Sequence, residues 1–223
     1  MKILVINGSP KGKQSDTLKL TNAFLEGMGQ TAKIIETMHA DIRPCLGCFD
    51  CWHKTPGSCV QNDDVAEILE EFREADMVIW SAPLYCYGLP SNCKALIDRL
   101  LPLSSPAQYV DENGQTHHPS RDNHHARMML ISGCGFPDRE GNFDGLIFQF
   151  RRMFGADAPL LLCVEAPLLS IPEAAPVAEP YLVLVRKAGM EFGRDGSISD
   201  ETQSRLDAPM FPPDQYRTMA SGS

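Results

Sequence analysis

The segment from Lys2 to Thr17 reads KILVINGSPKGKQSDT, and it decides the fold. Its start, Lys2 to Ile6, is a short apolar run rich in branched side chains, which is typical of a strand buried on both faces of a parallel sheet. A glycine-containing turn follows, and apolar residues then recur at helical spacing behind Ser15 or Asp16, either of which can cap a helix. The segment therefore predicts a strand, a turn and a helix in succession.

The same pattern repeats along the chain. Further short apolar runs predict strands at 32–37, 77–82, 127–132 and 159–164, and helical periodicity predicts helices at 65–72, 92–101, 143–154 and 177–192. Alternating strands and helices, with right-handed crossovers, predict an α/β protein with a doubly wound five-stranded parallel sheet. In such sheets ligands bind beyond the carboxyl ends of the strands, so we expect the site in the loops after the first, third and fourth strands.

The chain is expected to form one domain over residues 1–195. Residues 104–125 interrupt the rhythm between the third helix and the fourth strand, and we interpret them as an inserted loop or hairpin that carries four histidines. These are His117, His118, His124 and His125, whose adjacent pairs do not make a metal site because neighbouring strand residues face opposite ways. The polar residues 196–223 are predicted to be an irregular tail.

Charge and composition narrow the function classes. The 223 residues carry a formal net charge of -9, so nucleic acid and anionic membrane surfaces are disfavoured as partners. No apolar run approaches the roughly 18 residues that a membrane span requires. The first residues show neither a long apolar leader region nor a small-residue cleavage site, and we therefore expect a cytoplasmic protein with reduced thiols.

The turn after the first strand is a candidate anion site. Two glycines permit tight turns, Ser9, Ser15 and Thr17 offer hydroxyl groups, and the following helix directs its unpaired amides into the loop. Neither the dinucleotide motif GxGxxG nor the NTP motif GxxxxGK[ST] can be laid over it. The alternative is a polar strand-to-helix turn with an ordinary cap.

A resemblance sharpens this interpretation. The pattern NGSPKxxxSDTL, residues 7–18, closely resembles the phosphate loop of the flavodoxin-like NAD(P)H-dependent FMN reductase family, and similar segments continue at 81–85, 94–99 and 132–136, so that most of residues 1–192 is covered. The resemblance implies that the anion is the phosphate of FMN. The residues implied to hold it are Ser9, Pro10, Lys11, Ser15, Asp16, Thr17 and Leu18.

Two further loops resemble the family's flavin-enclosing segments. The first offers apolar and aromatic surface on which a flat ring can stack, and the second offers glycines for close approach. The implied residues are Pro83, Leu84, Tyr85, Cys86, Tyr87 and Gly88 in the first loop, and Ser132, Gly133, Cys134, Gly135 and Phe136 in the second. Alternatively, the tyrosines are merely packed under a neighbouring loop. Lys94, Asp98 and Arg99 also match the family, but their helical spacing equally suits a solvated face or a local ion pair.

Four cysteines, Cys45, Cys48, Cys51 and Cys59, follow the second predicted strand. Three thiolates at steps of three residues can converge on one face of a cluster, and a fourth can close it. The run resembles the compact motif of the iron-sulfur flavoproteins, in which a [4Fe-4S] cluster passes electrons to FMN. Free or oxidised thiols remain an alternative, and structural zinc is a weaker one because its ligand pairs usually lie further apart.

The predicted function is that of an FMN-dependent oxidoreductase. It would accept a hydride from NAD(P)H and pass electrons to a quinone, a flavin or a similar small acceptor, with no side chain required as an obligate acid or base. One alternative is an iron-sulfur electron carrier reduced by ferredoxin, and another is a non-enzymatic regulator that binds a phosphorylated ligand. We also expect a homodimer or homotetramer.

Overall fold

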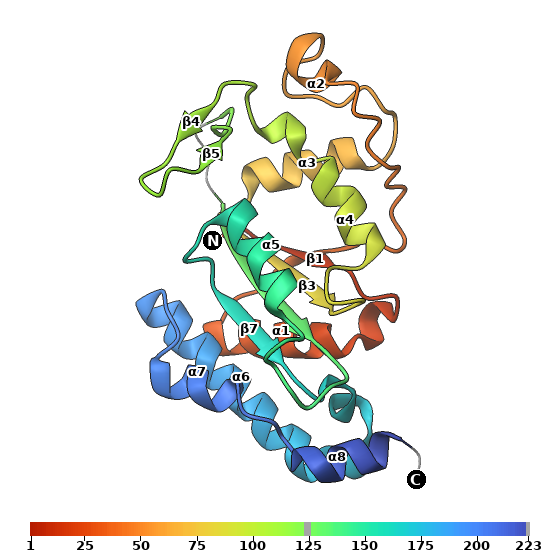
Figure 1. The fold of residues 1–223 in the computed structure, drawn as a ribbon, viewed down its shortest axis with the longest axis vertical. Coiled ribbons are helices and arrows are strands. Elements are labelled where there is room, and N and C mark those ends of the chain that lie inside the picture. Colours follow the sequence, from red (N-terminus) through yellow and green to blue (C-terminus); the bar gives the residue numbers. More distant parts are fainter. Residues whose placement is uncertain (123–125, 222–223) are drawn as a thin grey trace.

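The structure is a computed structural model that describes residues 1–122 and 126–221 (Figure 1). Its main sheet has five strands, all paired in parallel, in the order β2-β1-β3-β6-β7. They are β1 (Ile3–Asn7), β2 (Lys33–Glu36), β3 (Met77–Pro83), β6 (Arg127–Gly133) and β7 (Leu160–Cys163). The prediction of a doubly wound five-stranded parallel sheet is confirmed.

Helices cover both faces of this sheet (Figure 1). One face is covered by α1 (Asp16–Met28) and α6 (Ala175–Asp195), and the other by α3 (Val65–Glu74), α4 (Ser91–Asp98) and α5 (Asp144–Phe154). Within the described part of the chain, no helix combines the length and the apolar character that a membrane crossing requires.

Each central strand supplies both hydrophobic layers, because successive side chains of a strand point to opposite faces of the sheet. Val5 and Ile79 are fully buried in the layer under α1 and α6. Ile6 and Trp80, their neighbours along the chain, are fully buried in the layer under α3, α4 and α5. This two-sided burial explains why β1 and β3 are continuous apolar runs rather than alternating ones.

The helices α1 and α6 cross with their backbones in direct contact. A methyl group built on Gly189 would lie 2.0 Å from the carbonyl oxygen of Phe24, and one built on Gly27 would lie 2.0 Å from the carbonyl oxygen of Arg186. No side chain larger than hydrogen fits at either position without moving a helix. The two glycines therefore set the distance between the helices that cover this face.

A short antiparallel hairpin lies between α4 and β6. It consists of β4 (Tyr109–Val110) and β5 (Thr116–His117), within the segment 104–125. In Figure 1 it projects from the body of the protein beside α3. That the segment is an insertion relative to the family stays a prediction.

The described histidines of this segment have local partners. His117 lies 2.9 Å from a carboxylate oxygen of Asp111, and the ring nitrogen of His118 lies 2.8 Å from a backbone carbonyl oxygen. Both contacts are made within the hairpin region itself. His124 and His125 lie outside the described residues.

The C-terminal segment differs from the prediction. We expect an irregular tail over 196–223, but this region contains α7 (Asp200–Leu206) and α8 (Pro213–Ala220). Ser199 caps α7 by accepting a hydrogen bond at 3.3 Å from a first-turn amide. The prediction of irregularity is wrong because Ser199 caps α7 and because Pro213 begins α8, at a position where the missing N–H has no partner to lose.

We expect the substitution Gly189→Ala to destabilise the protein by about 1–3 kcal/mol, because the added methyl group separates α1 from α6. Equilibrium urea unfolding followed by circular dichroism measures this change. Gly193→Ala is the matched control: it lies on the same helix, but its methyl group would be 3.4 Å from the nearest backbone atom, in ordinary contact. Equal free energies of unfolding for the two variants would contradict the proposed role of the crossing.

Candidate functional site

Four loops meet at the carboxyl end of the sheet and line one cavity of about 150 Å³, the carboxyl-edge cavity. They follow β1, β3, β6 and β7. The lining residues are Ser9, Lys11, Ser15, Asp16, Thr17, Pro83, Leu84, Tyr85, Gly133, Cys134, Gly135, Ala166 and Pro167. The structure thus brings together three segments that the sequence assigns to one site.

Hydroxyl groups line the end of the cavity formed by residues 7–17, the phosphate loop. Ser15 caps α1 by accepting a hydrogen bond at 3.1 Å from the amide of Leu18, and its hydroxyl group lies 2.8 Å from that of Thr17. The carbonyl oxygen of Ser9 accepts a hydrogen bond at 3.2 Å from the amide of Gly12. These contacts fold the loop against the positive end of the helix dipole, where an anion is stabilised.

One ion pair lies inside the phosphate loop. The ammonium group of Lys11 is 2.7 Å from a carboxylate oxygen of Asp16, whose other oxygen is hydrogen-bonded to the hydroxyl group of Ser170. Lys11 therefore offsets the negative charge of Asp16 within the cavity. An anionic ligand would otherwise meet an unbalanced carboxylate.

The segment 83–88, the aromatic turn, forms a tight hairpin. The amides of Tyr85 and Gly88 donate hydrogen bonds to each other's carbonyl oxygens, both at 3.0 Å. Between them Cys86 and Tyr87 have φ values of 48° and 63°, which are unfavourable for side-chain-bearing residues. Tyr85 is 47% exposed, so the expectation that it is packed under a neighbouring loop is wrong for this structure.

The loop 133–138, the glycine loop, approaches the end of β7 closely. A methyl group on Gly133 would lie 2.7 Å from the side chain of Ala166, so only glycine fits there. The amide of Ala166 donates a hydrogen bond at 2.9 Å to the carbonyl oxygen of Cys134. Cys134 is buried, and burial raises the pKa of its thiol, which keeps it neutral.

Seven residues predicted to contact the cofactor do not line this cavity. They are Pro10, Leu18, Cys86, Tyr87, Gly88, Ser132 and Phe136. The side chain of Leu18 lies in the core, and its amide already donates to the capping hydroxyl group of Ser15. Ser132 is fully buried, and its hydroxyl group has no hydrogen-bond partner among the described residues. The cofactor-binding roles of these seven residues stay predictions.

Ala166 and Pro167 line the cavity although the sequence did not point to them. They follow β7, the last strand of the sheet, and none of the segments that carry the resemblance lies there. The signal that could find them is their position after a strand, because every loop that follows a strand of a parallel sheet begins at the same edge.

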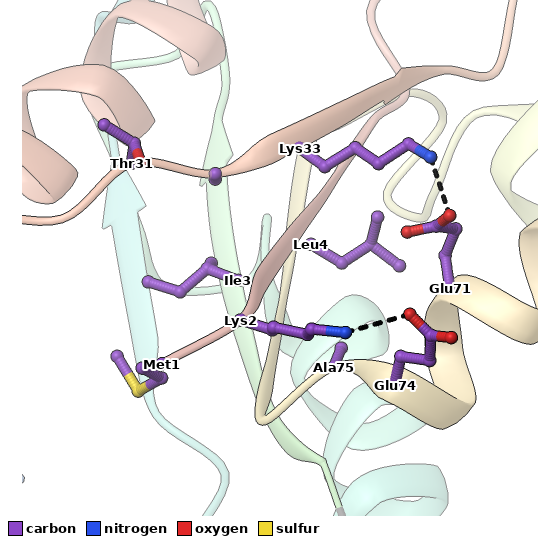
Figure 2. Close-up of a pocket in the computed structure, with 10 residues that line it drawn as sticks. Met1, Lys2, Ile3, Leu4, Thr31, Lys33, Glu71, Glu74 and Ala75 are labelled. Atoms are coloured by element: carbon purple, nitrogen blue, oxygen red, sulfur yellow. Dashed lines mark hydrogen bonds and ion pairs between the residues drawn. The ribbon is translucent and has the colours of Figure 1, made fainter.

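A larger cavity of about 310 Å³ lies at the opposite, amino-terminal edge of the strands (Figure 2). Two ion pairs cross it, Lys2 to Glu74 at 3.0 Å and Lys33 to Glu71 at 2.6 Å. These side chains are largely solvated, so the pairs contribute little to stability. The carboxyl-edge cavity offers hydroxyl groups and helix amides that suit an anionic ligand. Its chemistry is therefore more specific for a ligand than that of the larger cavity.

The four predicted metal ligands share one loop after β2. Cys45 and Cys48 are exposed, Cys51 is buried and Cys59 is partly buried. Burial raises the pKa of the Cys51 thiol, and the charges of the other three thiols raise it further, which reflects their proximity. Among the residues that the structure describes, no three His, Cys, Asp or Glu side chains form a metal-binding group. The metal assignment therefore stays a prediction.

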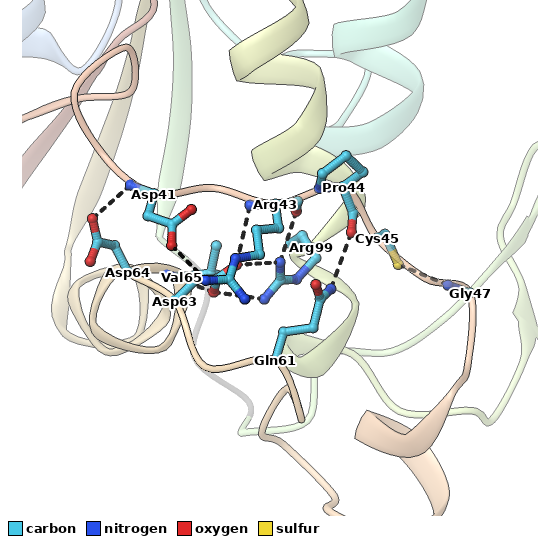
Figure 3. A network of polar contacts seen from close by, with 10 residues as sticks. All are labelled: Asp41, Arg43, Pro44, Cys45, Gly47, Gln61, Asp63, Asp64, Val65 and Arg99. Carbon is cyan, nitrogen blue, oxygen red and sulfur yellow. Dashed lines mark hydrogen bonds and ion pairs between the residues drawn. The ribbon is translucent and has the colours of Figure 1, made fainter.

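A buried arginine holds the two ends of residues 43–63, the cysteine loop, together (Figure 3). Arg99 follows α4 and is 1% exposed. Its guanidinium donates to the carbonyl oxygen of Arg43 at 2.8 Å and to both carboxylate oxygens of Asp63 at 2.8 and 2.9 Å. The expectation of a solvated face is therefore wrong for Arg99, whereas Lys94 and Asp98 do form an exposed local pair at 2.5 Å.

The charge of this buried pair is maintained by mutual hydrogen bonding. Burial opposes ionisation of Asp63, but hydrogen bonds from Arg99 and from the Arg43 amide outweigh it and hold the pKa of the carboxyl group below its usual range. Burial likewise opposes the charge on Arg99, but Asp63 and the nearby Cys59 thiol raise the pKa of the guanidinium. Both groups are therefore ionised at neutral pH.

The strand order, counted along the main sheet alone, is 2-1-3-4-5, with the candidate site at the carboxyl edge, and this combination defines the flavodoxin-like class of α/β proteins. A family model described as a flavodoxin-like fold matches residues 1–156. The chain belongs to this family.

Several relatives are similar to this chain. An iron-sulfur flavoprotein of Methanocaldococcus jannaschii is 36% identical over 105 residues, which cover 46% of this chain and 53% of the relative. An FMN-dependent NADH:quinone oxidoreductase of Methylocella silvestris is 29% identical over 87% of this chain and 91% of the relative. The chain spans about half the length of the curated relatives that it matches first, 53% and 48%.

A solved structure has the same fold. The crystal structure of an FMN-dependent NADH-azoreductase from Bacillus anthracis, in complex with FMN, superposes with a TM-score of 0.61 at 18% identity. The match covers 86% of this chain and 99% of that one.

The substitution Asp63→Asn is expected to destabilise the protein by about 3–5 kcal/mol at neutral pH, because it leaves a buried guanidinium without its counter-charge. Since the pKa of Asp63 is lowered by folding, its contribution is present above the usual carboxylate range and is lost as the pH falls below about 4. Urea unfolding at neutral and acidic pH tests both statements.

Asp64→Asn is the control for this comparison. Asp64 is the next residue, and its carboxylate accepts one exposed hydrogen bond at 2.7 Å from the amide of Asp41. We expect it to cost about 1 kcal/mol or less. If both variants lost the same stability, the buried pair would not have the importance assigned to it.

Proposed function

We propose that the protein is an FMN-dependent oxidoreductase that takes a hydride from NAD(P)H and passes electrons to a quinone or a similar small acceptor. The observation that carries this proposal is the carboxyl-edge cavity, in which hydroxyl groups at a helix N-terminus lie beside an aromatic turn and a glycine loop. A phosphate and a flat ring are the two chemical parts that such a cavity accommodates.

The phosphate of FMN would occupy the phosphate-loop end of the cavity. The hydroxyl groups of Ser9, Ser15 and Thr17 and the amides at the start of α1 are the donors, and Lys11 supplies positive charge. Charge-assisted hydrogen bonds of this kind are the strong ones in proteins. The cavity of about 150 Å³ suits a phosphate with its linker, so the ring would lie toward the open side.

The isoalloxazine ring would lie between the aromatic turn and the glycine loop. Tyr85 and Leu84 offer apolar surface, and Gly133 and Gly135 offer backbone that a ring can approach closely. Cys86, Tyr87, Gly88, Ser132 and Phe136 would then adjoin the ring from just outside the lined volume. When bound, the flavin supplies the redox chemistry, and the protein binds, orients and shields it.

The names of the relatives support this chemistry. The protein of Methylocella silvestris, similar over most of its length, is an FMN-dependent NADH:quinone oxidoreductase by name. The proposal is tested by purifying the protein and recording its visible spectrum. We expect a yellow protein that NADH or NADPH bleaches and a quinone reoxidises. A protein with no affinity for FMN would refute the proposal and favour the non-enzymatic regulator, whereas FMN binding without bleaching by NADH or NADPH would favour the electron carrier.

We expect apoprotein to bind FMN about 100-fold more tightly than riboflavin, because only FMN makes charge-assisted hydrogen bonds to the phosphate loop. Lys11→Met should reduce this preference about 10-fold, since Asp16 then repels the phosphate without compensation. Fluorescence titration of both flavins measures the ratio. Lys2→Met, which removes an ammonium group at the opposite edge of the sheet, is the control and should leave the ratio unchanged.

A second candidate function is an iron-sulfur flavoprotein electron carrier, reduced by ferredoxin. It is favoured by the position of all four cysteines in one loop and by the iron-sulfur flavoproteins among the relatives. Four soft thiolate ligands fit an iron-sulfur cluster, with Cys45, Cys48, Cys51 and Cys59 as the ligands.

Anaerobic purification followed by iron and sulfide analysis tests this candidate. If it is right, we expect about four of each per chain, and Cys45→Ser should lower both. Cys86→Ser is the control, because Cys86 is also exposed but lies in the aromatic turn. A wild-type protein free of iron and sulfide would exclude the carrier while leaving the oxidoreductase proposal intact.

A further inference from the structure

The family match ends at residue 156, yet the remaining chain contributes directly to the carboxyl-edge cavity. Ala166 and Pro167 line it. Residues 207–217, here called the C-terminal brace, lie against the same region, and α8 lies near the end of β7 in Figure 1. A segment beyond the matched residues therefore borders the candidate site.

Glu165 is the first anchor of the C-terminal brace. It is fully buried, and one carboxylate oxygen accepts a hydrogen bond at 2.9 Å from the amide of Phe211. Its backbone has a φ of 55°, a strained conformation for a residue with a side chain. The same residue's amide donates at 2.9 Å to the carbonyl oxygen of Phe136, so Glu165 joins the brace to the glycine loop.

Tyr216 is the second anchor. Its side chain is 4% exposed, and its hydroxyl group donates a hydrogen bond at 3.0 Å to the carbonyl oxygen of Gly135. Gly135 itself lines the carboxyl-edge cavity. The brace thus supplies a partner to the backbone of a cavity-lining residue.

Two ion pairs add to the contact between the C-terminal brace and the end of the glycine loop. Arg217 donates to both carboxylate oxygens of Asp138 at 2.8 Å, and Arg139 pairs with Asp207. Arg217 and Asp138 are about half exposed, so this pair contributes little by itself. The two buried anchors are the contacts that can hold the glycine loop.

We propose that the C-terminal brace fixes the conformation of the glycine loop for flavin binding, with Glu165 and Tyr216 as positioning residues. This rests on the proposed function, because the flavin ring is placed beside that loop. A loop that is ordered before binding costs less to order when the ligand arrives. Loss of an anchor should therefore weaken FMN binding and loosen the glycine loop. The phosphate loop should still bind the phosphate group.

The first experiment compares Tyr216→Phe with Tyr181→Phe. Both tyrosines are buried, and Tyr181 donates a similar hydrogen bond at 2.9 Å to the carbonyl oxygen of Leu206, which is not a residue of the glycine loop. We expect Tyr216→Phe to weaken FMN binding about 3- to 10-fold and to speed amide hydrogen exchange in residues 133–138 of the apoprotein. Tyr181→Phe should change neither property, although it removes a comparable bond.

The second experiment replaces the other anchor. Glu165→Ala removes the acceptor for the Phe211 amide and should weaken FMN binding at least as much as Tyr216→Phe, about 10-fold. Glu165→Gln keeps an acceptor oxygen and the same shape, so it should restore binding to within about 2-fold of wild type. The visible spectrum of bound FMN should shift in the alanine variant and not in the glutamine variant.

The outcomes separate the two proposals. Unchanged FMN affinity and unchanged exchange in both Tyr216→Phe and Glu165→Ala would refute the brace, whatever the enzyme does. Equal effects of Tyr216→Phe and Tyr181→Phe would also refute it, because the effect would then be one of general stability. A wild-type protein that binds no FMN would refute the proposed function, while hydrogen exchange in the apoprotein would still test the brace.

Discussion

Parallel pairing of the central strands is the constraint on which the candidate site depends. Because all five strands run the same way, the loops after β1, β3, β6 and β7 begin at one edge of the sheet, although more than a hundred residues separate the first loop from the last. The ladder continues into these loops: the amide of Gly8 donates to the carbonyl oxygen of Ser81, and that of Leu84 donates to Gly133, both at 2.9 Å. The loops are therefore held by sheet hydrogen bonds before any ligand contributes.

Buried polar groups hold the parts of the structure that lack regular hydrogen bonding. Arg99 and Asp63 close the cysteine loop, and Glu165 and Tyr216 hold the glycine loop. In each case a side chain satisfies backbone groups of a segment that no helix or strand would satisfy. Buried charge is costly even when it is paired, so the ion pair of Arg99 and Asp63 favours one loop conformation over others more than it adds net stability.

Local electrostatics differ from the charge of the whole chain. The net charge of -9 disfavours polyanionic partners, yet the phosphate loop combines helix amides, hydroxyl groups and Lys11 in one small cavity. A helix dipole and a few donors act over several ångströms and are little affected by distant, solvated carboxylates. An acidic protein can thus offer one local site whose donors favour an anion.

Local sequence patterns predicted the sheet, the helices that cover it and the turn before α1, because two-sided burial imposes continuous apolar strands and a helix start needs a capping residue such as Ser15. They also assigned three of the four loops to one edge. Only the tertiary structure decided that Ala166 and Pro167 complete the cavity, that Arg99 is buried against Asp63, and that the C-terminal residues are helical and hold the glycine loop. Periodicity and capping act over a few residues, whereas these contacts join distant segments whose partners leave no local pattern: 36 residues separate Arg99 from Asp63, and 81 separate Tyr216 from Gly135.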